Sequence, residues 1–202
     1  MTRIKICGLS RPEDVDFING ARPDWCGFII NFPKSRRNVT PDQVRALRAR
    51  LAPGITPVGV FVDQPAEAVA ALLGDGTIEV AQLHGRDDED YLAALRTLAP
   101  GKTIWKAFQV RSIAQVQSAQ ASSADCILLD SGQGSGAAFD WSLARDVRRP
   151  FLLAGGLTPD NLPRAIQQVR PMGVDLSSGV ETEYQKDRNK ILAAVAAARQ
   201  TT

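Results

Sequence analysis

The fold is organised around Arg3-Ile4-Lys5-Ile6-Cys7-Gly8, which has the composition of a buried strand that ends at a thiol. Two β-branched residues flank a single lysine, a pattern that favours a strand. Gly8 permits a sharp turn of the backbone. The following Ser10-Arg11-Pro12-Glu13 has the form of a capping box with proline at the first helical position, so a helix is predicted to start there.

The same unit of strand, loop and helix recurs outward from this stretch along the chain. Each apolar run is followed by a loop with Gly or Ser and then by a helix start, such as the capping box Thr40-Pro41-Asp42-Gln43. The predicted strands cover residues 3–7, 25–30, 57–62, 79–83, 103–108, 125–130, 150–154 and 173–176. The predicted helices start at residues 10–13, 40–43, 65, 87–90, 112, 158–160 and 186.

Strict alternation of strands and helices requires parallel strands, because each helix returns the chain to the same end of the sheet. Eight such units predict a closed (β/α)8 barrel, the TIM barrel, with residues 1–202 as a single domain. The alternative is an open doubly wound sheet. Against it, the first strand is not followed by a glycine-rich dinucleotide fingerprint.

Composition and charge argue against several classes of protein. The chain has 24 Lys and Arg and 22 Asp and Glu residues, and their even spread predicts neither nucleic-acid binding nor a membrane surface. No apolar run reaches the roughly 18 residues of a membrane span, and the chain opens on a strand rather than a signal peptide. The cysteines Cys7, Cys26 and Cys126 are odd in number and widely spaced, which is typical of reduced thiols. We therefore expect a cytoplasmic protein.

In a TIM barrel the polar residues at the carboxyl ends of the strands gather at one mouth. Here they include Cys7, His84 and Asp130, and the last two strands are followed by Gly155-Gly156 and by Ser178-Gly179. Loops of this kind commonly hold a phosphate on backbone N–H groups, so a phosphate site is predicted there. Tight turns explain the glycines equally well one loop at a time.

Cys7 and Asp130 are the candidates for proton transfer. Asp130 closes the apolar run Ile127-Leu128-Leu129, whose surroundings tend to raise the pKa of a carboxyl group and suit a general acid. Cys7 would be the base, provided that nearby positive charge lowers its pKa. Together with a phosphate site, this predicts proton shuttling on a sugar phosphate. The alternatives are that Asp130 caps the following loop and that Cys7 is a small buried apolar group.

The loop 31–38 is long and carries Lys34, Arg36 and Arg37. An arginine above the mouth could hold a substrate carboxylate through paired N–H donors. We expect Arg36 to be a solvated surface charge. For Lys34 the sequence favours neither this role nor that of a carboxylate ligand. Asp175 lies inside the last strand, where a structural hydrogen bond near Cys7 is expected rather than a catalytic part.

An ordered set of motifs runs from residue 3 to the last predicted helix and resembles the phosphoribosylanthranilate isomerase family of tryptophan biosynthesis. It consists of Lys5-Ile6-Cys7-Gly8, Gly27-Phe28, Pro33-Lys34-Ser35-Arg36-Arg37, Gly59-Val60-Phe61-Val62, Gln82-Leu83-His84-Gly85, Leu128-Leu129-Asp130, Gly134-Ser135-Gly136, Phe139-Asp140-Trp141, Ala154-Gly155-Gly156-Leu157 and Val174-Asp175-Leu176-Ser177-Ser178-Gly179-Val180-Glu181.

The resemblance implies an Amadori rearrangement of N-(5-phosphoribosyl)anthranilate to 1-(2-carboxyphenylamino)-1-deoxyribulose 5-phosphate, without metal or organic cofactor. It implies Cys7 as general base, Asp130 as general acid and Arg37 as the ligand of the anthranilate carboxylate. It also implies a wall or hydrogen-bonding role for His84. The implied phosphate cradle consists of Gly155, Gly156, Ser178 and Gly179.

Two departures from the family pattern affect the long loop. Asn38 stands where an aromatic or bulky residue often follows the arginine, and Ile29-Ile30-Asn31-Phe32 is an uncommon end for the second strand. Both bear on the conformation of the loop more than on the chemistry. The Gly- and Ser-rich segment 131–138 is expected to be mobile until substrate orders it.

Three other functions remain open at this point. The histidine-pathway isomerase that performs the same rearrangement on an aminoimidazole substrate would usually carry aspartate at the place of Cys7. A thiol hydrolase needs a histidine beside the cysteine, and His84 is the only histidine. A non-catalytic barrel that binds a phosphorylated ligand would tolerate loss of Cys7 or Asp130. Both a monomer and a homodimer fit so compact a chain.

Overall fold

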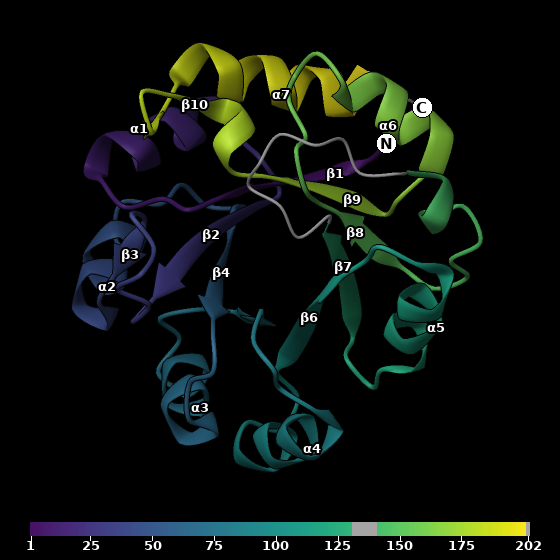
Figure 1. The fold of residues 1–202 in the computed structure, drawn as a ribbon. Helices are drawn as coiled ribbons and strands as arrows, with labels where there is room; N and C mark the ends of the chain where they lie inside the picture. The colour runs from purple at the N-terminus through teal and green to yellow at the C-terminus, as the bar shows by residue number, and fades with distance from the viewer. Residues whose placement is uncertain (131–140, 201–202) are drawn as a thin grey trace.

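The computed structural model describes residues 1–130 and 141–200, and the central feature of these residues is a closed parallel barrel (Figure 1). Its strands are β1 (Arg3–Cys7), β2 (Trp25–Ile30), β4 (Thr56–Phe61), β5 (Val80–Leu83), β6 (Thr103–Gln109), β7 (Cys126–Asp130), β8 (Phe151–Leu153) and β9 (Gly173–Leu176). The two-residue strand β3 (Asn38–Val39) pairs with the outer end of β2.

The order of hydrogen-bonded strands is β1-β9-β8-β7-β6-β5-β4-β2, and β1 pairs with β2 to close the ring. Every pair in this ring is parallel, including β1 with β9, where Lys5 lies opposite Asp175. The predicted (β/α)8 barrel is therefore confirmed, and the open sheet is wrong. Closure gives every barrel strand two neighbours and so leaves no unpaired strand edge.

Helices surround the barrel and return the chain to the amino ends of the strands (Figure 1). They are α1 (Pro12–Ala21), α2 (Pro41–Arg48), α3 (Ala66–Gly74), α4 (Glu89–Leu98), α5 (Ile113–Ala121), α6 (Leu162–Val169) and α7 (Arg188–Gln200). Between β7 and β8 the described residues form only the short 3-10 helix η1 (Trp141–Ala144). A second 3-10 helix, η2 (Ser178–Val180), follows β9.

Capping explains where the first helices begin. The predicted box at α2 is confirmed, because Thr40 and Gln43 exchange hydrogen bonds between side chain and backbone at 3.3 and 2.8 Å. At α1 proline does occupy the first turn, but the predicted box Ser10–Glu13 is wrong. Arg11 is the N-cap residue, and the carboxylate of buried Asp14 accepts hydrogen bonds from the backbone N–H groups of both Ser10 and Arg11. A carboxylate is a stronger acceptor than a hydroxyl, which shifts the cap by one residue.

The last two helices begin later than predicted. Thr158 and Asn161 exchange hydrogen bonds at 2.9 and 3.3 Å and form a separate turn, so α6 starts only at Leu162. Residues near 186 form an antiparallel hairpin instead of a helix start. Its strands are β10 (Glu181–Thr182) and β11 (Gln185–Lys186), and α7 begins after it at Arg188.

Side chains alternate between the inside and the outside of the barrel, as the period of two requires. A small inner cluster fills the lower barrel, where Trp25 and Trp105 pack edge to face with ring centroids 5.1 Å apart. On β1, Ile4 and Ile6 belong to the large outer core beneath the helices. Lys5 and Cys7 therefore face the interior, above the tryptophans. The barrel thus has an apolar lower layer and a polar upper layer.

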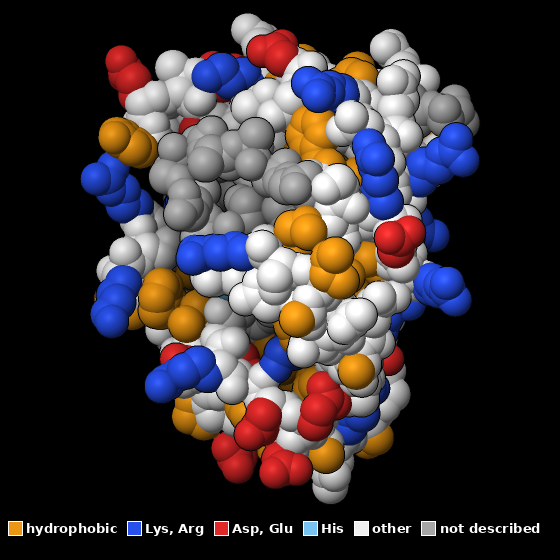
Figure 2. Space-filling view, turned by 45° about the vertical axis from the view of Figure 1, so that its right-hand side comes forward, with side chains coloured by type: hydrophobic (Ala, Val, Ile, Leu, Met, Phe, Trp, Pro, Cys, Tyr) orange, Lys and Arg blue, Asp and Glu red, His pale blue; other side chains and the backbone are white. Residues whose placement is uncertain are grey.

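The surface carries charges of both signs. On the face in Figure 2, Lys and Arg side chains are scattered, and acidic side chains gather at the lower end. This face presents no continuous basic area among the residues drawn in colour. Within the described ranges, no helix is both long and apolar enough to cross a membrane.

Candidate active site

A cavity of about 660 Å³ opens at the carboxyl ends of the barrel strands. It is lined by seven of the residues singled out in the sequence, namely Cys7, His84, Asp130, Gly155, Gly156, Ser178 and Gly179. Asp175, Gln82, Gln109 and Asn161 also line it. The barrel therefore brings residues from β1, β5, β7, β8 and β9 into one compartment, as the fold class predicts.

Cys7 is 6% exposed and lies at the carboxyl end of β1, beside a buried ion pair. Lys5, which is fully buried, donates to both carboxylate oxygens of Asp175 at 3.1 and 2.9 Å. The positive charge of the Lys5 ammonium acts to lower the pKa of the Cys7 thiol. Gly27 on the neighbouring strand faces both groups, since a Cβ there would lie 2.7 Å from Sγ of Cys7 and 3.0 Å from Nζ of Lys5.

The ionisation of these groups is governed by burial and by their mutual charges. Burial raises the pKa of the Cys7 thiol, and the opposing effect of the Lys5 ammonium does not cancel it. Burial alone would lower the pKa of Lys5, but Asp175 and Cys7 raise it above its ordinary value. The positive charge that the sequence argument required is thus present, but it does not bring the pKa of the buried thiol below its ordinary value.

Asp130 ends β7 on the inner face of the barrel, and its side chain is 23% exposed. Its Oδ2 atom lies 3.9 Å from Nε2 of His84, which is beyond hydrogen-bond distance. The backbone N–H of His84 donates to the carbonyl of Phe61 at 2.8 Å, and this fixes the residue at the end of β5. His84 thus forms part of the cavity wall near Asp130.

The loops after β8 and β9 meet at one side of the cavity. Gly155 and Gly156 adopt positive φ angles of 87° and 65°, which favour glycine. Gly179 lies so close to the neighbouring loop that a Cβ would be 1.9 Å from the carbonyl oxygen of Leu157. Gly155 and Gly156 therefore permit a backbone conformation that favours glycine, and Gly179 permits the close approach of the two loops.

Arg37 lies beside the cavity rather than in its lining, with its side chain against Gly8. Its Nε and Nη2 atoms donate to the two carboxylate oxygens of Glu181 at 2.6 and 2.5 Å. Lys186 donates to the same carboxylate at 2.6 Å and to the carbonyl of Ser177 at 3.0 Å. Burial raises the pKa of Glu181, but these two cations outweigh it and lower the pKa overall. Arg37 is thus held in place by a carboxylate of this chain.

The long loop is closed by Asn38, one of the two departures noted in the sequence. Oδ1 of Asn38 accepts a hydrogen bond from the backbone N–H of Phe32 at 2.5 Å. Lys34 and Arg36 are exposed, and the Arg36 guanidinium stacks on Tyr184 at 4.2 Å from the ring centroid. Arg36 is therefore a surface group with an aromatic partner. The segment 131–138 lies outside the described residues.

Sequence reasoning missed Lys5, Glu181 and Lys186. Lys5 could have been found, because it lies two residues before Cys7 on a strand and must share its face. No local signal pointed to Glu181, which is 144 positions from Arg37. Only the tertiary fold brings those two together.

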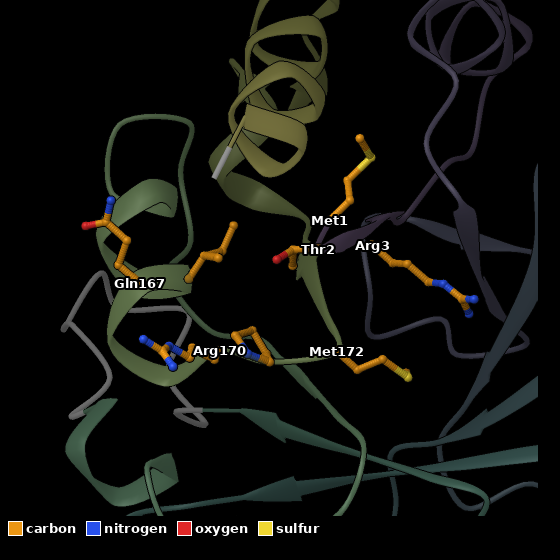
Figure 3. A pocket seen from close by; sticks show the side chains of 8 residues that line it. Met1, Thr2, Arg3, Gln167, Arg170 and Met172 are labelled. Carbon is orange, nitrogen blue, oxygen red and sulfur yellow. The ribbon is translucent and has the colours of Figure 1, made fainter. Parts of the chain in front are cut away.

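A second cavity of about 670 Å³ lies at the opposite end of the barrel (Figure 3). It is formed by the first residues of the chain up to the start of β1, the end of α6 and the segment before β9, among them Met1, Arg3, Arg170 and Met172. None of the sequence-predicted site residues lines it. In a TIM barrel this amino end serves stability, so we place the candidate active site in the upper cavity.

A closed parallel barrel with a polar cavity at the carboxyl ends of its strands defines the class of TIM-barrel enzymes. The family model for N-(5'-phosphoribosyl)anthranilate isomerase matches residues 4–197 of this chain. The chain therefore belongs to the N-(5'-phosphoribosyl)anthranilate isomerase family and acts in tryptophan biosynthesis. The resemblance noted in the sequence is confirmed.

Individual members of the family are similar to this chain over nearly its full length. The N-(5'-phosphoribosyl)anthranilate isomerase of Endomicrobium trichonymphae is 42% identical over 200 residues, which cover 96% of this chain and 97% of the relative. The solved isomerase from Thermotoga maritima superposes with a TM-score of 0.89 at 34% identity and covers 99% of this chain and 100% of the other. A crystal structure of the isomerase with reduced 1-(o-carboxyphenylamino)-1-deoxyribulose 5-phosphate gives a TM-score of 0.87 at 33% identity, with 99% and 100% covered.

Proposed function

We propose that this isomerase works by general acid and base catalysis in the upper cavity, with Asp130 as the acid and Cys7 as the base. The single observation that carries the proposal is that both side chains line one cavity of about 660 Å³, from β7 and from β1. A phosphorylated sugar bound between them would meet the two groups on different sides. The reaction requires such a separation, because its two proton transfers occur at different atoms.

The proposed chemistry begins at the furanose ring. Asp130 gives its proton to the ring oxygen, the C1–O bond breaks, and the nitrogen lone pair forms the Schiff base. Cys7 then removes the proton from C2, and the electrons of that bond move to give an enolamine. Tautomerisation of the enolamine yields the ketose product. The substrate as a whole neither loses nor gains electrons in these steps, so the reaction needs no redox cofactor.

The phosphate of the substrate is proposed to bind at Gly155, Gly156, Ser178 and Gly179. Support comes from their position in one side wall of the cavity and from the close packing of the two loops at Gly179. In addition, the isomerase of known structure at 33% identity was solved with a phosphorylated ligand. Backbone N–H groups of such loops suit a phosphate because they donate without adding charge.

Gly179→Ala tests this cradle. A Cβ 1.9 Å from the Leu157 carbonyl oxygen must push the two loops apart, so we expect KM to rise at least about tenfold and the free energy of unfolding to fall by about 1–3 kcal/mol. Steady-state kinetics and urea unfolding measure both quantities. Gly74→Ala is the control, because a Cβ there meets nothing within 4 Å. A normal KM in Gly179→Ala would argue against the proposed phosphate site.

Arg37 is proposed to hold the anthranilate carboxylate. Its Nε and Nη2 atoms already donate to Glu181. The N–H groups of Nη1 can donate further hydrogen bonds to a substrate carboxylate. Glu181 thereby fixes the plane of the guanidinium before substrate arrives. This arrangement supplies orientation at little entropic cost on binding.

Arg37→Ala should mainly raise KM, by roughly 10-fold to 100-fold, because a charge-assisted hydrogen bond contributes about 1.5–3 kcal/mol. The neighbouring Arg36→Ala is the matched control and should leave KM unchanged, since Arg36 stacks on Tyr184 at the surface. Initial rates over a range of substrate concentrations separate KM from kcat. Equal KM values for the two variants would refute the carboxylate role.

The direct test of the function is turnover of N-(5-phosphoribosyl)anthranilate by the purified chain, followed by loss of substrate fluorescence with a chelator present. We expect full activity, because the proposed roles use only side chains and backbone groups. Within the described ranges no three His, Cys, Asp or Glu side chains are placed to hold a metal ion. Activity that disappears with the chelator and returns with a divalent metal would contradict the mechanism.

Two further properties are proposed. We expect a cytoplasmic enzyme, since Cys7, Cys26 and Cys126 are all free thiols and a reducing compartment suits them. A homodimer is supported by the related isomerase from Thermotoga maritima, which is described as dimeric. Sedimentation equilibrium over a range of concentrations distinguishes a dimer from a monomer.

A further inference from the structure

Lys5 is an unusual residue for the interior of this barrel. Its side chain is fully buried, while the layer below it consists of apolar side chains such as Trp25 and Trp105. A buried charge costs several kcal/mol unless it is paired, and an apolar residue would fill the same space without that cost. The position of Lys5 beside the proposed catalytic thiol points to a purpose other than stability.

Three strands combine to place the charge. Lys5 and Cys7 lie two residues apart on β1 and share its inner face. Asp175, directly opposite Lys5 on β9, accepts hydrogen bonds from the ammonium with both carboxylate oxygens, at 3.1 and 2.9 Å. On the other side, Gly27 of β2 lies opposite Cys7 and leaves the space in which the ammonium and the thiol meet.

We propose that Lys5 is a positioning residue for Cys7, whose ammonium, fixed by Asp175 and admitted by the missing side chain at Gly27, stabilises the thiolate form of Cys7. The inference rests on the proposed function, since it concerns how the base of that reaction is prepared. Asp175 has two effects in this arrangement. It keeps Lys5 charged and in place, and its own negative charge opposes the thiolate.

Other charged groups act on the same thiol. Lys186 of β11 and Arg37 of the loop before β3 interact electrostatically with it. His84 and Asp130 line the same cavity, and Cys26 is a neighbouring thiol. Lys186 and Arg37 are themselves bound to Glu181. Lys5 is the cation with the largest effect on Cys7, and it acts to lower a thiol pKa that burial raises.

The test is the rate at which iodoacetamide alkylates Cys7 as a function of pH, followed by mass spectrometry of the peptide that contains it. Lys5→Met should move the midpoint to higher pH by roughly one unit or more, because the nearby positive charge is lost. At a pH below the midpoint this slows alkylation at least about tenfold. Asp175→Asn should move the midpoint in the opposite direction. A merely structural role would not produce shifts of opposite sign.

Gly27→Ala tests the geometry without changing any charge. The new Cβ would have to displace the thiol or the ammonium, so the midpoint should also rise. Gly20→Ala in α1 is the control, because a Cβ there meets nothing within 4 Å. If Lys5→Met is too unstable to purify, the double variant Lys5→Met/Asp175→Asn removes both charges together and should give a midpoint above that of wild type, because Lys5 has the larger effect on Cys7.

A folded Lys5→Met protein with the wild-type midpoint would overturn the inference. So would shifts of the same sign in Lys5→Met and Asp175→Asn. Alkylation reports the thiol and not the isomerase reaction, so the two proposals can fail separately. Shifted midpoints with normal turnover in Cys7→Ala would leave Lys5 as the partner of the thiol and remove Cys7 as the base.

Discussion

Cys7→Ala should lower kcat by about 10²- to 10⁴-fold while substrate binding largely survives. The expected loss is the contribution of a positioned general base, and the methyl group of alanine cannot accept a proton. Binding should persist because the proposed phosphate and carboxylate contacts come from other loops, at Gly155–Gly156, Ser178–Gly179 and Arg37. Single-turnover fluorescence and a separate binding titration with a product analogue distinguish the two effects.

Cys126→Ala is the matched control for this prediction. Cys126 is a second buried thiol on an inner face of the barrel, but it lies in the apolar lower layer beneath the cavity. Its loss should cost some stability and leave kcat within about twofold of wild type. A Cys7→Ala variant that turns over at the rate of Cys126→Ala would remove the thiol from the mechanism.

The dependence of the reaction on pH follows from the same residue. Burial raises the pKa of the Cys7 thiol, so at neutral pH the base form is a minor species in the free enzyme. We expect kcat/KM to increase with pH through the thiol pKa, because deprotonation creates the base. In Cys7→Ala this rising limb should be absent from whatever activity remains.

Asp130→Asn should reduce kcat to a similar extent, by about 10²- to 10⁴-fold. The amide has the shape of the carboxyl group and cannot deliver its proton to the ring oxygen, so the ring-opening step is lost while the cavity keeps its form. Asp160→Asn, which changes an exposed carboxylate in the turn after β8, should leave kcat unchanged. Pre-steady-state fluorescence measures the first step directly.

The double variant Cys7→Ala/Asp130→Asn sharpens the assignment. Residues that serve one reaction sequence show strongly non-additive losses, so the double variant should be little slower than either single variant. If the fold-loss of kcat in the double variant equalled the product of the two single losses, the two groups would act independently. An Asp130→Asn enzyme with wild-type kcat would exclude the carboxyl group as the acid.

Much of the candidate site could be predicted because the fold places strand ends at one mouth. Cys7, His84, Asp130 and the two glycine-rich loops were each found at the end of an apolar run, and all of them line the cavity. The charge of the long loop indicated that an arginine could bind a carboxylate, and only the family resemblance pointed to Arg37. Its bond to Glu181 could not be predicted, because the two residues meet only through the hairpin β10–β11, which the sequence did not indicate.

The ends of elements were less predictable than their existence. Thr158-Pro159-Asp160 has the chemistry of a helix start, yet Thr158 bonds to Asn161 and delays α6 by a turn. Similarly, Arg11 rather than Ser10 is the N-cap residue of α1, and the Asp14 carboxylate accepts hydrogen bonds from the backbone N–H groups of Ser10 and Arg11. In each case hydrogen bonds from backbone N–H groups to nearby side chains accompany the shifted helix start, and a local pattern does not contain their geometry.

The local amino-acid pattern specifies the alternation of strands and helices, since the period of apolar residues and the helix caps are local properties of the chain. It also determined which polar residues end the strands. Long-range packing alone brings Lys5 to Asp175, 170 residues away, and places both Cys7 and the Lys5 ammonium against Gly27. Closure of β1 onto both β2 and β9 creates this contact, and the resulting burial sets the direction in which the thiol pKa moves.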